Sequence, residues 1–224
     1  MEGKKRPDPP DGPLGGPAPE VFAVTDLERR TPDGKPVRGR LAVRVPRSEE
    51  GTEHFPPHLW VVPAEDASRG YELYETEGEA ALLCRVEPVP GAGGERFRVK
   101  DELGTELGTV QRTPAAKRTV QHSWWIQQPG HGEAVARYHW AKPAAVEAGE
   151  DSGGRLFGGM LGAFTDPGAE GGEAVPFIRR PVTWEADNEV VLTAQQHTGY
   201  RSYRVHADWF DARLGFALAL LREG

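Results

Sequence analysis

The sequence has a single cysteine, Cys84, among 224 residues, and it has no apolar run long enough to cross a bilayer. One cysteine excludes an internal disulfide and a zinc site built from cysteines. Basic residues are also in the minority, because 27 Lys and Arg stand against 34 Asp and Glu, a formal net charge of −7 at pH 7. This balance argues against a general nucleic-acid binder, which needs a basic surface.

The N-terminus lacks an apolar stretch of the kind found in signal peptides, so we expect a cytoplasmic protein. Residues 1–19 are instead rich in Pro and Gly and contain few large apolar side chains, which predicts a disordered tail. We expect residues 20–224 to form a single β-barrel domain. Within that domain, residues 147–172 are acidic and Gly-rich and are predicted to form an insertion.

The C-terminus predicts a helix that is apolar on nearly every face, from Trp209 to Arg222, with Asp208 able to cap its first turn. Such a helix would be about 21 Å long at ~1.5 Å per residue, whereas a bilayer requires ~20 apolar residues, so no transmembrane segment is expected. A helix that is apolar all round must be surrounded by other elements. Because the upstream sequence predicts strands, we expect a mainly β fold, an antiparallel β-barrel of hairpins wrapped around this buried helix.

Three segments have the alternating pattern of β-hairpins, at residues 97–110, 124–137 and 182–193. Each pairs two alternating stretches around a reversal that is rich in Gly, Pro, Asp or Asn, and these residues tolerate the backbone angles of tight turns. The third reversal is the dipeptide Asp187-Asn188. The spacing predicts a meander in which consecutive strands are neighbours.

An apolar island interrupts the predicted insertion. Its Gly residues disfavour both helix and strand, yet its large side chains favour burial. Three interpretations stay open: a loop folded over the barrel, a plug that binds a partner protein, and a loop that touches a membrane. The candidate contact residues are Leu156, Phe157, Met160, Leu161 and Phe164.

Two parts of the chain resemble a known superfamily. The first is a strand-pair motif formed by Phe97, Val99, Asp101, Gly104, Leu107, Gly108 and Val110. The second is the strand at Tyr203 and Val205, followed by the apolar helix up to Leu221. Together they resemble the tubby C-terminal-like superfamily, which includes the LURP-one-related proteins and the phospholipid scramblases. The resemblance covers residues 71–221 and implies a closed antiparallel barrel around a central hydrophobic C-terminal helix.

The resemblance also implies binding without catalysis. Tubby domains bind phosphoinositides through basic side chains on the barrel, and the scramblase relatives are linked to calcium and membrane lipid. The acidic stretches at residues 147–151 and 166–173 lack the alternating spacing of a calcium loop. A phosphate head group needs two or three converging cations, and the candidates here are Arg112, Lys117, Arg118, Arg179 and Arg180.

We therefore expect a non-enzymatic binding or scaffold protein without a cofactor, peripheral at the inner membrane surface. Its expected partners are membrane lipid head groups or another protein.

One alternative is a serine hydrolase, because residues 151–154 read Asp-Ser-Gly-Gly, as in the nucleophile loop of trypsin-like proteases. Ser152 would be the nucleophile. Against this, Glu150 stands where that family usually has Gly, and no His is found in the family's Ala-Ala-His-Cys setting. We expect no catalytic residues.

A metal site is a second alternative. His54 and His58 have the spacing of a helical metal pair, but Pro56 and Pro57 between them forbid a regular helix. The other histidines are scattered along the predicted strands and loops, so no metal site is predicted.

Overall fold

The computed structural model describes residues 18–49, 51–64, 70–78, 80–91, 95–113, 124–138 and 181–223. The predicted tail lies almost entirely outside these residues, and the predicted insertion lies wholly outside them. The described elements are β1 (Val21–Arg30), β2 (Pro36–Arg44), β3 (Arg47–Glu49), β4 (Thr52–His54), β5 (Pro57–Pro63), β6 (Tyr71–Tyr74), β7 (Leu82–Pro88), β8 (Glu95–Asp101), β9 (Glu106–Arg112), β10 (Trp124–Gln127), β11 (Ala134–Tyr138), β12 (Val182–Ala186), β13 (Glu189–His197), β14 (Tyr200–Val205) and α1 (Ala212–Glu223).

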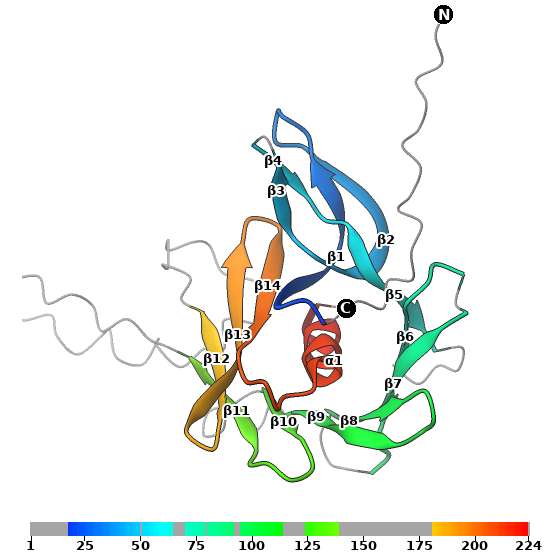
Figure 1. Ribbon diagram of the computed structural model, residues 1–224, viewed down its shortest axis with the longest axis vertical. Coiled ribbons are helices and arrows are strands. Elements are labelled where there is room, and N and C mark those ends of the chain that lie inside the picture. Colours follow the sequence, from blue (N-terminus) through cyan, green and yellow to red (C-terminus); the bar gives the residue numbers. More distant parts are fainter. Residues whose placement is uncertain are drawn as a thin grey trace, which may run out of the picture.

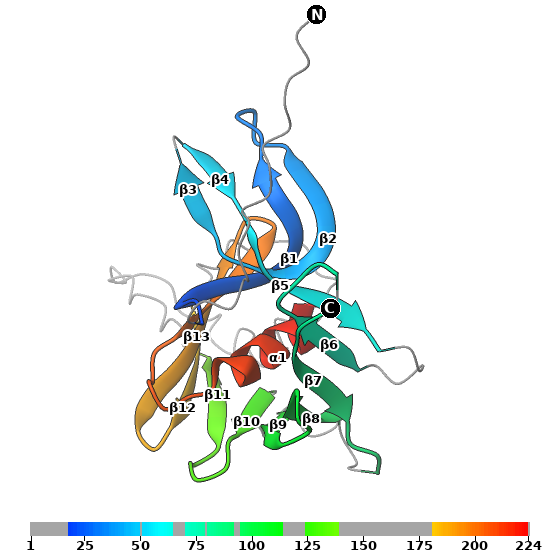
Figure 2. The same ribbon diagram turned by 45° about the vertical axis from the view of Figure 1, so that its right-hand side comes forward.

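Twelve of the described strands form a closed antiparallel barrel (Figures 1 and 2). Neighbouring strands pair in the order β14, β13, β12, β11, β10, β9, β8, β7, β6, β5, β2, β1, and β1 closes the ring by pairing with β14. The remaining two strands, β3 and β4, form a hairpin that joins the far half of β1 through Arg29 and His54. The predicted β-barrel is therefore confirmed.

The interior of the barrel is built from alternate residues of each strand. Ala136, Trp184 and Leu192 lie side by side on β11, β12 and β13, and all three are fully buried. The reversal at Asp187 and Asn188 has positive φ at both residues, 52° and 65°, as a two-residue primed turn requires. The predicted turn at this dipeptide is confirmed.

The helix α1 occupies the middle of the ring (Figure 1), and every residue from Leu214 to Leu220 is buried. It lies close against β9 at Gly108, where a Cβ atom would come within 2.3 Å of the Gln127 carbonyl oxygen and 3.1 Å of the Leu214 side chain. On the other side, Phe216 packs edge-on against Phe22 with ring centroids 4.7 Å apart. The predicted buried helix is confirmed. No described helix is long and apolar enough to cross a membrane.

The helix begins three residues later than the sequence predicts, and Asp208 is not its cap. Asp211 is the cap, because its Oδ1 accepts a hydrogen bond from the Arg213 backbone N–H at 2.9 Å. The side chain of Gln128 explains the difference. Its amide donates to the Trp209 carbonyl oxygen and its oxygen accepts from the Asp211 N–H, both at 2.9 Å, so residues 207–211 are held as a turn.

Arg44 is buried where β1, β2 and the β4–β5 connection meet. Its guanidinium donates to three backbone carbonyl oxygens, those of Thr25 (3.1 Å), Phe55 (2.8 Å) and Arg40 (2.8 Å). A buried arginine is tolerated only when its donors are paired in this way. The side chain thus ties together three segments that are not consecutive in sequence.

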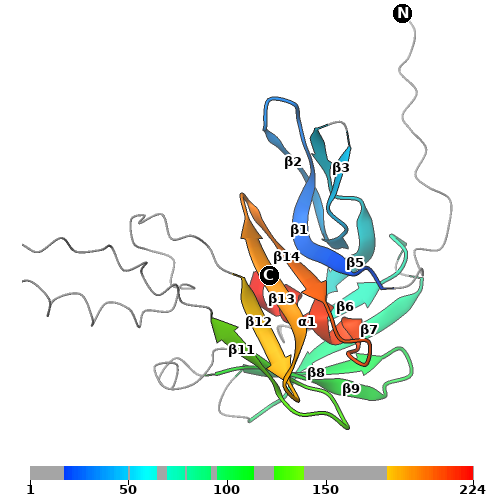
Figure 3. The ribbon, with the colours of Figure 1, turned by 60° about the vertical axis from the view of Figure 1, so that its left-hand side comes forward.

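The two ends of the barrel are distinguished by the ends of α1. We call the end where the helix begins the proximal rim; it contains the connections 75–81, 102–105, 128–133, 187–188 and 206–211. We call the end where the helix finishes the distal rim; it contains the strand ends at Arg112, Trp124, Tyr138, Val182 and Tyr200. In Figure 3, β11 ends and β12 begins on the side of the barrel where the C-terminus is marked.

Candidate functional site

Of the five predicted head-group cations, only Arg112 lies among the described residues. It is the last residue of β9, and its guanidinium carbon lies 5.6 Å from the ring centroid of Trp124 on the neighbouring strand. This separation is within the range of a cation–π contact. Lys117, Arg118, Arg179 and Arg180 lie outside the described residues.

The predicted contact residues of the apolar island, Leu156, Phe157, Met160, Leu161 and Phe164, also lie outside the described residues, as does Ser152. What the structure does define is the strand ends between which these segments connect. Arg112 is paired with Trp124 across β9 and β10, and Tyr138 is paired with Val182 across β11 and β12. Both connections therefore leave from and return to the distal rim.

A polar cluster surrounds the end of α1 at the distal rim. Glu223 Oε1 accepts hydrogen bonds from the Arg201 guanidinium and from the Tyr203 hydroxyl, the latter at 2.9 Å. Burial raises the pKa of Tyr203 well above its usual value, so this hydroxyl stays protonated and acts as a donor. The cluster fixes the last turn of the helix to β14.

Arg222 completes the distal rim. Its guanidinium carbon lies 5.1 Å from the ring centroid of Trp184, which is buried inside the barrel on β12. Arg112, Arg201 and Arg222 thus come from β9, β14 and α1 to the same end of the barrel. A positive side chain near a helix C-terminus is also favourable to the helix itself, because it opposes the helix dipole.

The proximal rim is rich in carboxylates. The five connections named above contain no Lys or Arg, although Arg47 lies in the β2–β5 connection at the same end, and their described acidic residues are Glu75, Glu77, Glu102, Glu133, Asp187, Asp208 and Asp211. Near the start of α1 this charge has a structural role, because carboxylates stabilise a helix N-terminus.

An aromatic pair lies among these acids. The rings of His131 and Trp209 stack with centroids 3.8 Å apart, and the Trp209 indole N–H donates to Glu189 at 2.9 Å.

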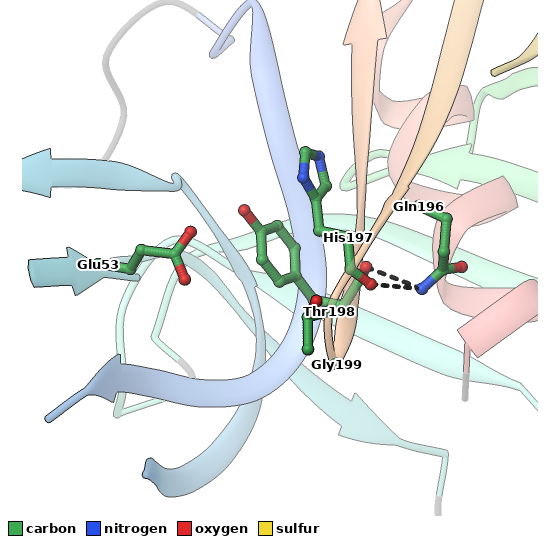
Figure 4. A pocket seen from close by; sticks show the side chains of 6 residues that line it. Glu53, Gln196, His197, Thr198 and Gly199 are labelled. Atoms are coloured by element: carbon green, nitrogen blue, oxygen red, sulfur yellow. Dashed lines mark hydrogen bonds between the residues drawn. The ribbon is translucent and has the colours of Figure 1, made fainter. Parts of the chain in front are cut away.

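A polar hollow of about 670 Å³ lies beside the β13–β14 turn (Figure 4), lined by Glu53, Gln196, His197, Thr198, Gly199 and Tyr200. Several of its groups are already engaged with the protein. Arg30 pairs with Glu53 at 2.8 Å and donates to the Thr198 carbonyl oxygen, which pins the β3–β4 hairpin to the turn. Burial, together with the Glu53 carboxylate, raises the pKa of Tyr200, so its phenol is neutral. The side chains around the hollow therefore hold the β3–β4 and β13–β14 hairpins together.

The histidines do not gather at a common centre in the part of the chain that the structure describes. Within those residues, no three His, Cys, Asp or Glu side chains are placed to hold a metal ion. His197 instead stacks on Tyr200 and makes a 2.8 Å hydrogen bond to Ser202 Oγ. His58 lies beside Phe216, with ring centroids 6.2 Å apart.

Sequence reasoning missed Arg201, Arg222 and Trp184 as members of one site. The sequence contained part of this information. Arg201 and Tyr203 are two residues apart, so they lie on the same face of β14, and Arg222 falls in the last turn of the helix. The convergence of β12, β14 and α1 depends on barrel closure, which no local pattern encodes.

Comparisons of the chain with protein-family models, with curated proteins and with solved structures found no match. The class that the fold defines is a closed antiparallel barrel of twelve described strands with a C-terminal helix inside it.

Proposed function

We propose that this protein is a non-enzymatic binding protein of the tubby-like kind, which contacts anionic membrane lipid head groups at the distal rim of its barrel. The proposal extends the resemblance drawn from residues 71–221. The closed barrel with its C-terminal helix is consistent with the architecture that the resemblance implies.

The occupied interior supports binding at a rim or on the outer face. Residues 214–220 of α1 are buried against the strands, so the helix stands where an open barrel would hold a ligand. A ligand as large as a lipid head group must therefore approach from outside.

The basic residues of the distal rim are the observation that carries the proposal. Arg112 lies at the distal end of β9, and Arg201 and Arg222 lie at the same end of the barrel, on β14 and α1. The strand ends that flank the pairs Lys117–Arg118 and Arg179–Arg180 also lie at the distal rim, although the second connection carries the acidic insertion as well. An anionic surface attracts clustered Lys and Arg, and we infer that these pairs contact it in spite of the net charge of −7.

Flotation of the full-length protein with vesicles tests the proposal. We expect binding to vesicles that contain anionic lipid, no binding to neutral vesicles, and weakening as salt is raised, because exposed charges are screened within ~10 Å at 0.1 M salt. Replacing Lys117, Arg118, Arg179 and Arg180 by Gln should abolish flotation.

A matched control is Arg98→Gln. This arginine pairs with Glu106 at 3.0 Å and projects from β8 away from the buried Val99 face. It should leave flotation unchanged.

If the wild-type protein fails to float under every condition, lipid binding is wrong, and a pull-down with and without Phe157→Asp and Phe164→Asp would test the protein-partner alternative. Labelling of the wild type but not of Ser152→Ala by a fluorophosphonate probe would support a hydrolase.

A further inference from the structure

Trp184 carries a buried hydrogen-bond donor without an acceptor among the described residues. Its ring is fully buried, and its indole Nε1–H makes no hydrogen bond there. An indole nitrogen can only donate, and buried donors are nearly always paired. Trp184 lies on the inner face of β12, and the residue that covers it comes from the distal rim.

Arg222, whose guanidinium lies over the Trp184 ring, also has a buried donor without an acceptor among the described residues. This donor is its Nη1. The nearby carboxylate of Glu223 is engaged by Arg201 and Tyr203. Within the described chain, the charge of Arg222 is therefore not paired with a carboxylate.

We propose that Trp184 Nε1–H and Arg222 Nη1 are the donors of a binding site for one oxyanion group, a phosphate or a carboxylate, at the distal rim. A guanidinium with an adjacent neutral N–H suits such a group, because charge-assisted hydrogen bonds to its oxygens are strong and directional. The oxyanion could come from a lipid head group or from free phosphate. The inference rests on the proposed function only where the phosphate belongs to a lipid.

Access to the site depends on the side chain of Arg222. Both donors are buried without ligand, and the cover over the indole is a long, flexible side chain in the last turn of α1. An entering oxyanion draws the guanidinium from the ring face onto one of its oxygens, and a second oxygen accepts from the indole N–H at the edge of the same ring. Arg201 balances Glu223, so the site has a net positive charge despite the negative end of the helix dipole.

The test is the indole N–H signal of Trp184 in a nitrogen–proton correlation spectrum of the full-length protein. Trp184→Phe assigns the signal among those of the six tryptophans. We expect inorganic phosphate to move it saturably, with sodium chloride at equal ionic strength as the reference. Arg222→Gln should weaken phosphate binding by about tenfold or more. The phosphate affinity of Arg222→Lys should lie between those of the wild type and Arg222→Gln.

A matched control is Arg137→Gln on the neighbouring strand, where the guanidinium pairs with Glu185 at 2.6 Å. It should leave phosphate binding unchanged. If phosphate fails to move the Trp184 signal, or if Arg222→Gln binds as tightly as the wild type, the inference is wrong.

Vesicles with anionic lipid separate this inference from the proposed function. A Trp184 response to phosphate without vesicle binding would support the oxyanion site and contradict the lipid proposal. Vesicle binding with an unmoved Trp184 signal would support the lipid proposal and contradict the oxyanion site. A response to both, weakened in both by Arg222→Gln, would identify the lipid phosphate as the ligand.

Discussion

At the scale of single residues, stability depends on a few polar side chains that are buried in the fold. Arg44 pairs with three carbonyl oxygens from separate segments, and Tyr203 donates to Glu223 inside the distal rim. Each such hydrogen bond adds little net stability, because the groups also bond to water in the unfolded chain. Removing one partner is costly, since the other is left desolvated and without a hydrogen bond.

We predict that Arg44→Leu lowers the free energy of unfolding by at least about 2 kcal/mol, because three carbonyl groups, two of them in buried hydrogen bonds, lose their donor. Urea denaturation would measure the change. Arg38→Leu on the same strand is the matched control; Arg38 pairs with Asp26 at the surface, so the loss should stay below about 1 kcal/mol. Equal losses for the two variants would contradict the role assigned to Arg44.

His58 predicts a pH dependence of stability. Burial lowers the pKa of His58 below its usual value near 6.5, although Glu75 opposes the shift. Above that value the imidazole is neutral in both states and stability is unaffected. As the pH falls through about 6.5, the unfolded chain takes up a proton that the folded chain resists, so the folded state loses stability.

The measurement is the free energy of unfolding from pH 7.5 to pH 5. The wild type should lose stability more steeply than His58→Gln in this window. His54→Gln, at a half-buried position on β4, is the control and should follow the wild type. Parallel curves for His58→Gln and the wild type would show that this histidine is not responsible.

At the scale of the elements, the helix and the strand that it touches most closely determine the packing. Leu218 is fully buried in the middle of α1, whereas Leu103, at a proximal turn, is 84% exposed. Gly108 allows β9 to approach both β10 and α1.

We predict that Leu218→Ala costs about 2–5 kcal/mol of unfolding free energy, because it leaves a cavity in the core, and that Leu218→Asp prevents folding. Leu103→Ala removes the same atoms from an exposed site and should change stability by less than about 0.5 kcal/mol. Thermal and urea unfolding would measure both. A soluble, cooperative Leu218→Asp protein would contradict a central helix.

Gly108→Ala should be far more harmful than Gly104→Ala. Both glycines have positive φ, 155° and 85°, so both substitutions strain the backbone. Only at Gly108 would the new Cβ also clash, at 2.3 Å from the Gln127 carbonyl oxygen, because nothing lies within 4 Å at Gly104. We expect about 1 kcal/mol for Gly104→Ala and at least twice that for Gly108→Ala, measured by urea denaturation.

At the scale of the whole molecule, the proposed head-group cations predict the orientation of the barrel on an anionic surface, with the distal rim toward the lipid. A fluorescent label at Thr198→Cys, in the exposed β13–β14 turn of the distal rim, should be quenched by labelled lipid. The same label at Leu103→Cys, on the proximal rim, should be quenched less. Cys84 should not react, because burial raises its pKa to about 12. Stronger quenching at residue 103 would contradict the proposed orientation.

Much of this architecture could be predicted without the structure, because it is encoded in short-range patterns. Alternation along residues 97–110, 124–137 and 182–193 predicted the hairpins, and Asp187-Asn188 predicted a turn that needs two positive φ angles. The helix that is apolar all round predicted its own burial. Such patterns reflect the periods of strands and helices, which each segment carries by itself.

Barrel closure and the membership of the distal rim were decided only by the tertiary structure. The pairing of β1 with β14, the hydrogen bonds of Gln128 to the turn before α1, and the contact of Arg222 with Trp184 all join residues far apart in the chain. The sequence determined by itself what each segment would become, because local periods and turn residues are read one segment at a time. The three-dimensional register decided which side chains would meet, because the contacts between distant strands form only when the ring closes.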